Sequence, residues 1–318
     1  MEQSESSLQR VRLVSMRYGA RDIVLYELEA LDDTELMSVE PGAHLDVHLL
    51  NGMVRQYSLL TSQCDARRYV IGVKREESGR GGSIWLHDNA RVGQVFEVSV
   101  PRNHFALTEG DAPVLLLAGG IGITPIFSMF QVLCEQGRRV HLHYWCRSTE
   151  HALFRELLEG RQNVTLHYSN TSDTGRRPLL DVFQGVDSNT EVYCCGPQRM
   201  LAEIDIIAPQ LGSRLHVERF QGAESVATAD QAFTVVLARS GSEIGVGVGE
   251  SILEVLQAAG ADVMYSCEQG ICGACEVKVI EGEPVHCDSV RSAQEHQRRG
   301  TMMICCSSSV SNRLVLDI

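Results

Sequence analysis

The chain has 318 residues, of which 44% are hydrophobic, and its formal net charge is −13. This composition excludes a disordered chain and leaves length for two or three globular domains. The acidic balance argues against a nucleic-acid partner, because binding phosphates requires a basic face. No apolar run has the length of a transmembrane helix and the polar N-terminus lacks a secretory signal, so we expect a cytoplasmic protein that binds no membrane.

Residues 9–100 contain six short segments in which apolar and polar side chains alternate, separated by polar or Gly/Pro turns. They are "QRVRLVSMRY", "DIVLYELEA", "AHLDVHLL", "VRQYSLL", "RRYVIGVKR" and "QVFEVSV". Six short strands without a long helix predict an antiparallel β-barrel.

The pattern changes at "APVLLLAGG", a continuous apolar run typical of a parallel strand that is covered on both faces. Thr124-Pro125 predicts a helix N-cap followed by proline at the first helical position, and Gly137 predicts the end of that helix. Strands and helices then alternate as far as "RLHVERF", which predicts an α/β domain with a parallel sheet. The further helices are expected around "HALFRELLE", "LLDVF" and "QRMLAEIDII", between the strands "RRVHLHYWC", "NVTLHYS" and "EVYCC".

The segment "QGAESVATADQA" loses this periodicity and is interpreted as an interdomain linker. After it we expect a hairpin ("FTVVLARS", "EIGVGV"), a helix capped by Ser251, a cysteine-rich loop, and the strands "CEVKVIEG" and "RLVLDI". This last region is an α+β domain.

Cys267, Cys272 and Cys275 have C-x4-C-x2-C spacing, and Cys305 lies 30 residues after Cys275. This is the spacing of plant-type 2Fe–2S sites, in which a tight loop supplies three thiolates and a distant segment the fourth. The adjacent Cys306 leaves the choice of the fourth ligand open.

Other thiol chemistries fit this loop less well. A zinc site would favour two C-x2-C pairs or added histidines, and a thioredoxin-like motif would lie beside a βαβ unit. Disulfides are disfavoured in a chain with 11 cysteines and no export signal. Gly270 and Gly273 suit a cluster loop, because glycine can take the positive φ that brings backbone N–H groups close to sulfur.

Two stretches of the predicted barrel, "RQYSL" and "VKREESGRGGS", carry groups that suit a flavin. Arg55 could grip a phosphate with its guanidinium fork, Tyr57 could stack on an isoalloxazine ring, and Ser58 could bond near the flavin N5. "GRGGS" is either a phosphate-binding row of backbone N–H groups or a flexible loop.

"AGGIGITP" follows the first apolar strand of the α/β region. It fails as a G-x-G-x-x-G fingerprint, because the third glycine falls at Pro125, but a glycine turn between strand and helix suits a pyrophosphate. "CCGP" and "HVERF" end their strands at the same carboxyl edge of the sheet, where open α/β sheets bind ligands.

The order of "RQYS", "GRGGS", "GGIGITP", "YCCGP", "HVERF" and "CEQGICGAC" with Cys305 covers nearly the whole chain. It resembles the phthalate dioxygenase reductase family, which includes the vanillate O-demethylase reductases. The resemblance implies a flavin-binding β-barrel domain (1–108), an NAD-binding α/β domain (109–222), a linker (223–231) and a β-grasp, plant-type ferredoxin domain (232–318).

The resemblance also implies the cofactors FMN, NADH and a 2Fe–2S cluster, and it assigns their residues. The cluster ligands are Cys267, Cys272, Cys275 and Cys305, the last because a short apolar run like "MMIC" precedes the fourth cysteine of plant-type ferredoxins. The catalytic residues are expected to be Ser58, Tyr57, Phe220 and Glu218. Glu218 is included for its position at the end of the strand "HVERF" and not from the resemblance, and a glutamate there could instead be solvated. The residues expected to bind flavin or nicotinamide cofactor are Arg55, Gln56, Tyr57, Ser58, Lys74, Gly81, Gly82, Ser83, Gly119, Gly120, Gly122, Thr124, Asp173, Cys195, Gly196, Pro197 and Phe220.

The function implied is that of a monomeric reductase component, which passes electrons from NADH through FMN and the cluster to a separate Rieske-type oxygenase. Several alternatives stay open. Asp173 favours NADH, whereas the nearby Arg176 and Arg177 would favour NADPH, and FAD could replace FMN. The chain could instead be a redox sensor, or a ferredoxin-type carrier with an inert N-terminal scaffold.

Overall fold

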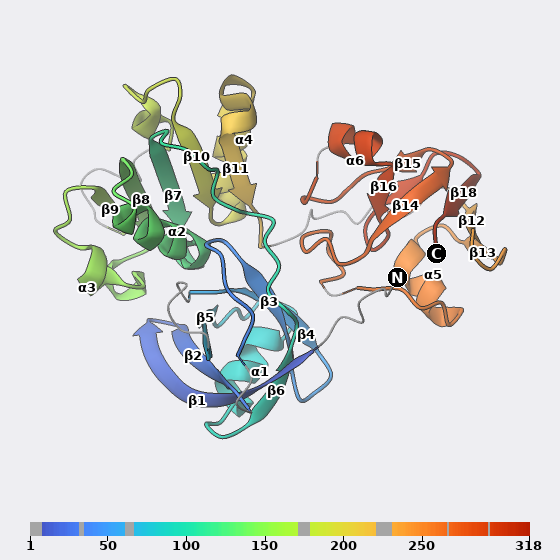
Figure 1. Ribbon diagram of the computed structural model, residues 1–318, viewed down its shortest axis with the longest axis horizontal. Coiled ribbons are helices and arrows are strands. Elements are labelled where there is room, and N and C mark those ends of the chain that lie inside the picture. The colour runs from blue at the N-terminus through green and yellow to red at the C-terminus, as the bar shows by residue number, and fades with distance from the viewer. Residues whose placement is uncertain are drawn as a thin grey trace. The chain divides into compact units, whose positions relative to one another are not determined.

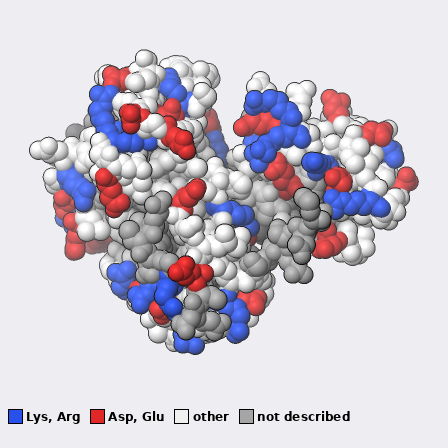
Figure 2. All heavy atoms as spheres, in the orientation of Figure 1, with Lys and Arg blue, Asp and Glu red and all other residues white. Residues whose placement is uncertain are grey.

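The structure, a computed structural model, describes residues 8–31, 35–60, 67–170, 179–220, 231–265, 267–291 and 293–318. The chain forms two compact units, Met1–Arg219 and Phe220–Ile318 (Figure 1). Most of the predicted linker, residues 223–230, lies outside the described residues. Within the described ranges, no helix has the combination of length and hydrophobicity that crossing a membrane requires. Acidic and basic side chains are interspersed on the face shown in Figure 2.

The N-terminal part of the first unit is a six-stranded antiparallel sheet with the order β4-β3-β6-β1-β2-β5. A bridge between Leu59 and Ile71 joins the two edge strands and closes the sheet, which confirms the predicted barrel. Val11, Leu13 and Leu45 are fully buried in its core, as alternation along the strands requires. The strands are β1 (Gln9–Ala20), β2 (Ile23–Ala30), β3 (His44–His48), β4 (Val54–Ser58), β5 (Arg68–Lys74) and β6 (Val95–Val98).

Between β5 and β6 the structure has a helix, α1 (Gly82–Asn89), that the sequence did not indicate. Gly81 precedes it with a φ of 79°, a left-handed conformation that glycine adopts without strain. Leu86 is the only large side chain of the helix that is fully buried, so the helix leaves no apolar periodicity in the sequence. The last part of "GRGGS" is therefore the first turn of α1.

The second half of the first unit is a five-stranded parallel sheet with the order β11-β10-β7-β8-β9, as predicted. The strands are β7 (Val114–Gly119), β8 (Val140–Cys146), β9 (Val164–Tyr168), β10 (Glu191–Cys195) and β11 (Leu215–Glu218). The α-helices are α2 (Ile123–Glu135), α3 (Arg155–Leu158) and α4 (Gln198–Leu211), and the 3-10 turns are η1 (Gly120–Gly122), η2 (Thr149–His151), η3 (Leu179–Phe183) and η4 (Gly212–Arg214). The expected helix near "LLDVF" is thus only the 3-10 turn η3.

The start of α2 differs from the predicted cap. The helix begins at Ile123, directly after the turn η1, with Gly122 in the capping position. Thr124 lies inside the first turn and donates its hydroxyl hydrogen to the Ile121 carbonyl at 2.9 Å, so the prediction of Thr124 as the N-cap is wrong. The predicted end of the helix is confirmed, because Gly137 follows it with a φ of 68°.

The second unit is an α+β domain whose sheet has the order β13-β12-β18-β14-β16. β12 and β18 pair in parallel at its centre, although they lie at opposite ends of the domain's sequence. The elements are β12 (Phe233–Leu237), β13 (Glu243–Val246), α5 (Ile252–Ala258), β14 (Glu276–Glu281), β15 (Pro284–Val285), α6 (Ala293–Arg299), β16 (Thr301–Met303), β17 (Ser308–Ser309) and β18 (Arg313–Leu316). The sequence did not predict β15, β16, β17 and α6. The three strands are too short to show an alternation of apolar and polar residues, and α6 has His296 as its one buried side chain and so shows no apolar periodicity.

Ser251 caps α5 as predicted. Its side chain accepts the Glu254 N–H at 3.2 Å, and the Glu254 carboxylate accepts the Ser251 N–H at 3.2 Å. This reciprocal capping box satisfies two N–H groups at the start of the helix that precedes the cysteine loop.

Ser251→Ala should therefore destabilise the second unit by about 1 kcal/mol, since it removes the side-chain acceptor of the box. The free energy of unfolding of the second unit, measured by denaturant titration of the full chain with a spectroscopic signal from that unit, gives this loss. Gln257→Ala, at an exposed position of the same helix, is the matched control and should cost less. Equal losses in the two variants would contradict the role of the cap.

Candidate functional site

Arg55 on β4 lies over the start of α1. Its guanidinium donates to the carbonyl oxygens of Val54 (2.7 Å) and Arg80 (2.5 Å). A Cβ on Gly82 would lie 2.4 Å from Arg55 Cγ, so the helix start can come this close only because residue 82 is glycine. The first N–H groups of a helix have no carbonyl partner within it, so the guanidinium and the start of α1 together fit a phosphate group.

Lys74 and Ser83, two further predicted cofactor residues, both contact Glu76. Lys74 Nζ lies 3.0 Å from the Glu76 carboxylate, and Ser83 Oγ accepts the Glu76 N–H at 3.1 Å. Lys74 lowers the pKa of Glu76, which keeps that carboxyl ionised. The two residues thus fix the turn that leads from β5 into Gly81 and α1.

Strand alternation divides the predicted flavin residues of β4 between two faces. Arg55 and Tyr57 share one face, and Tyr57 packs with Trp85 against the barrel core. Gln56 and Ser58 share the other face. Among the described residues, neither the buried Gln56 Nε2 nor Ser58 Oγ has a hydrogen-bond partner.

Ser58 belongs to a group of three polar side chains in the first unit, of which Ser58 and His44 are buried and Glu218 is half-buried with its Oε2 atom shielded from solvent. His44 is paired with Ser58 across β3 and β4, and His44 Nδ1 lies 3.9 Å from Glu218 Oε1 at the end of β11. Both His44 nitrogens and Glu218 Oε2 also lack hydrogen-bond partners within the described part of the chain. Buried polar atoms usually have partners, so this group fits a polar ligand that inserts among them.

Burial makes this polar group neutral. It raises the pKa of Glu218 to about 8, and burial together with Arg102 and His104 lowers the pKa of His44 to about 3. At pH 7 the carboxyl is therefore mostly protonated and the imidazole uncharged, so their contact is not an ion pair. A neutral heterocycle can enter such a site without leaving a buried charge unpaired.

Cys195 extends the group on the parallel sheet. It is fully buried, and its register partner on β11 is Glu218. Burial, and secondarily Glu218, raises the pKa of the Cys195 thiol well above its ordinary value, so it stays protonated. The fold thus brings together three predicted residues, Ser58, Glu218 and Cys195. His44, which joins them, was not predicted, because a single histidine in a strand carries no motif.

The two predicted glycine turns of the α/β region pack backbone against backbone. A Cβ on Gly122 would lie 2.3 Å from the Cys195 carbonyl oxygen, and one on Gly119 would lie 2.6 Å from Pro197 Cδ. A Cβ on Gly196 would lie 3.2 Å from Gly119 Cα. The carboxyl ends of β7 and β10 therefore lie in close contact, with Met200 Sδ and the Pro197 ring packed against the glycines, and α2 starts beside them. This edge fits a pyrophosphate that approaches the backbone closely.

The other predicted nucleotide residues lie around this edge or beyond the described residues. Gly120 has a φ of 53° in η1, and Pro197 is the N-cap of α4. Thr124 is buried in the first turn of α2. Phe220 is half-buried and directly follows β11 and Arg219. Asp173 lies outside the described residues.

In the second unit, the loop between α5 and β14 directs backbone N–H groups at cysteine sulfurs. Cys267, Cys272, Cys275 and Cys305 are all buried. Five N–H groups point to three of their sulfurs at 3.2–3.4 Å, namely those of Gln269 and Ile271 to Cys267, those of Cys267 and Ala274 to Cys272, and that of Gly270 to Cys305. Gly270 and Gly273 have φ of 68° and 72°, which confirms the conformation expected of them.

These thiols lie close enough to affect each other's ionisation. The side chains of Cys272 and Cys305 raise the pKa of Cys267, and that of Cys305 raises the pKa of Cys275, with burial adding to both. Several thiolates so close together need a compensating positive charge. Iron ions supply that charge, and N–H groups directed at sulfur stabilise thiolate, so the donor set fits an iron–sulfur cluster.

The geometry distinguishes the two adjacent cysteines. Cys305 accepts the Gly270 N–H at 3.2 Å and interacts with the side chains of Cys267 and Cys275. The Cys306 thiol interacts with Cys305 alone among these side chains in its hydrogen bonding, and otherwise contacts the Met303 carbonyl and Ser307 Oγ, both at 3.9 Å. Cys305 is thus the one of the pair that lies among the loop cysteines.

Two family models match the chain in these regions. The oxidoreductase NAD-binding domain matches residues 116–205, and the 2Fe-2S iron-sulfur cluster binding domain matches residues 235–310. The first match spans both glycine turns, and the second spans all four clustered cysteines.

Relatives resemble the chain over its whole length. It is 44% identical over 312 residues to the phenoxybenzoate dioxygenase subunit beta of Ectopseudomonas oleovorans, covering 97% of both chains. It is 39% identical over 314 residues to the vanillate O-demethylase oxidoreductase of a Pseudomonas species, covering 97% of this chain and 99% of the relative. The solved structure of phthalate dioxygenase reductase, described as a modular structure for electron transfer from pyridine nucleotides to 2Fe–2S, matches with a TM-score of 0.72, 37% identity and 98% coverage of both chains.

The chain belongs to the phthalate dioxygenase reductase family. It is an oxidoreductase with an NAD-binding domain in the first compact unit and a 2Fe–2S domain in the second. Electron transfer between a nicotinamide nucleotide and an iron–sulfur cluster is therefore the chemistry for which the reductase is built.

Glu218→Gln should remove a pH dependence of stability from the reductase. The folded-state pKa of about 8 lies above the ordinary value of 4.5, so the folded protein holds this proton across a range in which the unfolded chain releases it. This difference in proton binding therefore lowers the free energy of unfolding of the wild type as the pH rises from about 4.5 to about 8, by at most about 1.4 kcal/mol per pH unit.

Denaturant unfolding of the first unit between pH 5 and pH 9 measures this effect. Glutamine cannot ionise, so the variant should gain stability relative to the wild type as the pH rises. Glu109→Gln, at an exposed position, is the control and should follow the wild-type curve. Parallel curves for wild type and Glu218→Gln would show that burial does not hold the proton.

Gly82→Ala should displace the Arg55 side chain, since the added methyl would occupy its present position. Losing a charge-assisted contact to phosphate costs about 1.5–3 kcal/mol, so flavin binding should weaken about 10- to 100-fold. Flavin dissociation constants measured on the reconstituted protein test this. Gly79→Ala, on the exposed turn before α1, should leave them unchanged. A Gly82→Ala protein that binds flavin normally would exclude this phosphate site.

Proposed function

We propose that this reductase takes electrons from NADH, passes them through FMN and a 2Fe–2S cluster, and delivers them one at a time to a separate Rieske-type oxygenase. The observation that carries the proposal is the loop in which five backbone N–H groups point at buried cysteine sulfurs, in a chain that also holds a nucleotide-binding sheet edge. The oxygenase systems to which the phenoxybenzoate and vanillate relatives belong support the class of partner.

The barrel and the start of α1 would bind FMN. Arg55 and the N–H groups at the start of α1 would hold its phosphate, with Gly81 and Gly82 giving the backbone room and Lys74 and Ser83 fixing the preceding turn. The use of FMN by the homologous phthalate dioxygenase reductase supports FMN over FAD. Tyr57 would pack beside the ring, while Gln56 and Ser58 offer polar atoms to its edge.

The edge at β7 and β10 would bind NADH. Gly119, Gly122 and Gly196 would let the pyrophosphate approach the backbone, with Gly120, Thr124 and Pro197 completing the turns. Asp173 would accept from a ribose hydroxyl, and Phe220 would cover the flavin.

The buried polar group would orient the nicotinamide. Ser58, Cys195 and Glu218 are adjacent and neutral, so they can donate hydrogen bonds and exclude water without attracting a counter-ion. His44 lies between Ser58 and Glu218, and its two ring nitrogens, which have no hydrogen-bond partner among the described residues, would be further contacts for the nicotinamide. When bound, FMN and the cluster supply the change from two-electron to one-electron transfer that this protein's own side chains cannot perform.

The proposed cluster ligands are Cys267, Cys272, Cys275 and Cys305. The proposed domain boundaries are 1–108, 109–222 and 232–318, with the linker at 223–231. We further propose that the reductase is a cytoplasmic monomer.

Cys272→Ser should separate the two halves of the electron path. Removing a cluster ligand should lower electron delivery to a reconstituted terminal oxygenase at least 100-fold, while NADH should still reduce the flavin within twofold of the wild-type rate. Stopped-flow absorbance follows flavin reduction, and NADH-coupled product formation follows delivery.

Cys134→Ser is the matched control, because Cys134 is a half-buried cysteine on α2, outside the ligand set. It should leave both rates unchanged. If flavin reduction stops in Cys272→Ser, or if delivery continues, the proposed order of electron flow is incorrect.

A further inference from the structure

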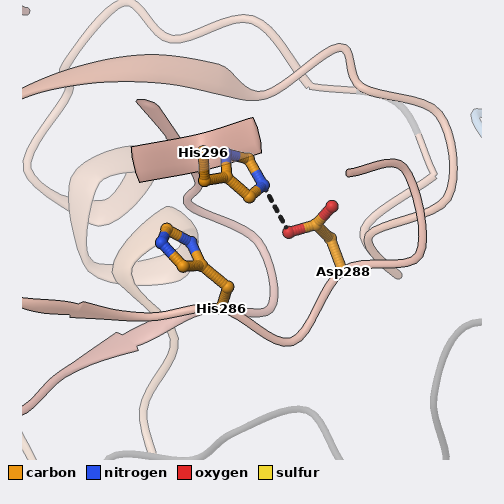
Figure 3. A group of neighbouring side chains, drawn as sticks. All are labelled: His286, Asp288 and His296. Atoms are coloured by element: carbon orange, nitrogen blue, oxygen red, sulfur yellow. Dashed lines mark hydrogen bonds and ion pairs between the residues drawn. The ribbon is translucent and has the colours of Figure 1, made fainter. Parts of the chain in front are cut away.

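Beside the cysteine loop, the second unit contains three polar side chains that none of the assigned motifs includes. His286 and Asp288 lie on the segment that follows β15, and His296 lies on α6 (Figure 3). The side chains of Asp288 and His296 are both 0% exposed, and His296 Nε2 lies 2.8 Å from Asp288 Oδ2. A fully buried pair of ionisable groups requires a reason, because burial without a partner is costly.

The hydrogen-bond directions fix one proton of His296. Both carboxylate oxygens of Glu276 accept from the Arg291 guanidinium, at 2.7 and 2.9 Å. The Thr301 hydroxyl donates its hydrogen to Glu276 Oε1 at 2.7 Å. Since that hydrogen is already used, the contact of 3.0 Å between Thr301 Oγ1 and His296 Nδ1 requires Nδ1 to carry a hydrogen and donate it.

A second proton must lie between His296 and Asp288. With Nδ1 protonated, Nε2 and Oδ2 can bond at 2.8 Å only if one of them carries a hydrogen. The other carboxyl oxygen, Oδ1, accepts the N–H groups of Val290 (3.1 Å) and Arg291 (2.9 Å). The pair therefore shares one proton, as imidazolium with carboxylate or as imidazole with carboxylic acid, and its net charge is zero in either form.

The segment that carries Asp288 packs directly on the cysteine loop. The Ser289 N–H donates to the Gly270 carbonyl at 2.8 Å, and a Cβ on Gly270 would lie 2.9 Å from Asp288 Cα. On its other side, the Gly270 N–H donates to Cys305 Sγ at 3.2 Å. The position of Asp288 thus determines where the Gly270 N–H points.

We propose that Asp288 and His296 are positioning residues for the iron–sulfur cluster, and that their proton-sharing pair sets the cluster's reduction potential through Gly270. The proposal rests on the proposed function, in which Cys305 is a cluster ligand. An N–H bond to a ligand sulfur stabilises the reduced cluster, which carries more negative charge, and so raises the potential. Loosening the segment around Asp288 weakens that bond and makes the potential more negative.

The same side chains do not suit a separate metal site as well. Their candidate ligand atoms lie within 4.8 Å of one another, but the rings of His286 and His296 stack face to face, 4.3 Å apart and 9° from parallel. Both nitrogens of His296 and both oxygens of Asp288 already have hydrogen-bond partners. The buried His286 Nδ1 has no hydrogen-bond partner among the described residues.

The test is the cluster reduction potential of the full-length holoprotein, measured by redox titration with EPR detection of the reduced cluster. Asp288→Ala removes the acceptor for His296 and for both N–H groups, and should lower the equilibrium constant for reduction at least tenfold, which is 59 mV for one electron. Asp288→Asn should stay within threefold of wild type, because its amide can donate to His296 Nε2 and its oxygen can accept the same N–H groups. His286→Gln, outside the hydrogen-bond chain, should also stay within threefold.

A wild-type potential in Asp288→Ala with an intact cluster overturns the proposal, as does an Asp288→Asn shift as large as that of Asp288→Ala. One zinc per chain in the wild type, abolished by His286→Gln, overturns it in favour of a metal site. If Asp288→Ala fails to hold a cluster, Thr301→Val decides instead. It removes only the hydroxyl that links His296 to Glu276, and an unchanged potential there rejects the proposal. Absence of any EPR-active cluster in the wild type would instead refute the proposed function.

Discussion

The hydrogen bond from the Gly270 N–H to Cys305 Sγ spans 3.2 Å and exists because the loop backbone enters the left-handed region at that residue. A side chain there would meet Cys306 Sγ at 2.5 Å and Asp288 Cα at 2.9 Å. The same need for a residue without a side chain recurs at Gly82, where a Cβ would meet Arg55, and at Gly122, where a Cβ would meet the Cys195 carbonyl oxygen. All three proposed cofactor sites therefore depend on positions where the loss of a side chain lets the backbone make the contacts.

The polar group around His44 in the first unit differs from the pair of Asp288 and His296 in the second. His44, Cys195 and Glu218 have pKa values shifted so that each is uncharged or mostly uncharged at neutral pH, and none of the three is part of a buried ion pair. In the second unit, Asp288 and His296 share a proton inside a closed hydrogen-bond chain. A site that admits a large planar ligand benefits from open, neutral hydrogen-bonding groups, whereas a site that must hold a loop in place benefits from satisfied ones.

The sequence was sufficient where a regular period or a motif of fixed spacing exists. The six barrel strands, the parallel sheet and the N-cap at Ser251 all follow from local patterns. The helix α1 was missed because Leu86 is its only large side chain that is fully buried, and Thr124 was assigned as a cap although the chain already turns at Gly122. Both errors arise where tertiary contacts, and not local preference, decide the backbone path.

The same limit applies to the candidate site. The four cysteines were assigned from their spacing, because the geometry of a cluster restricts the spacing of its ligands. His44 and the pair of Asp288 and His296 have no such spacing, because their partners come from distant strands and loops. Residues that act through a neighbour leave no pattern of their own in one sequence, and only the fold shows which neighbour it is.

Cys306 follows Cys305 at a turn where its buried thiol lies 2.5 Å from the position of a Gly270 Cβ. A fifth sulfur, that of Cys306, therefore lies next to the four proposed ligands. Replacing Cys305 alone leaves a thiol one residue away that can substitute for it, so a surviving cluster in such a variant would not identify the native ligand. Ligand assignment by mutagenesis in this reductase requires both adjacent cysteines to be changed, separately and together.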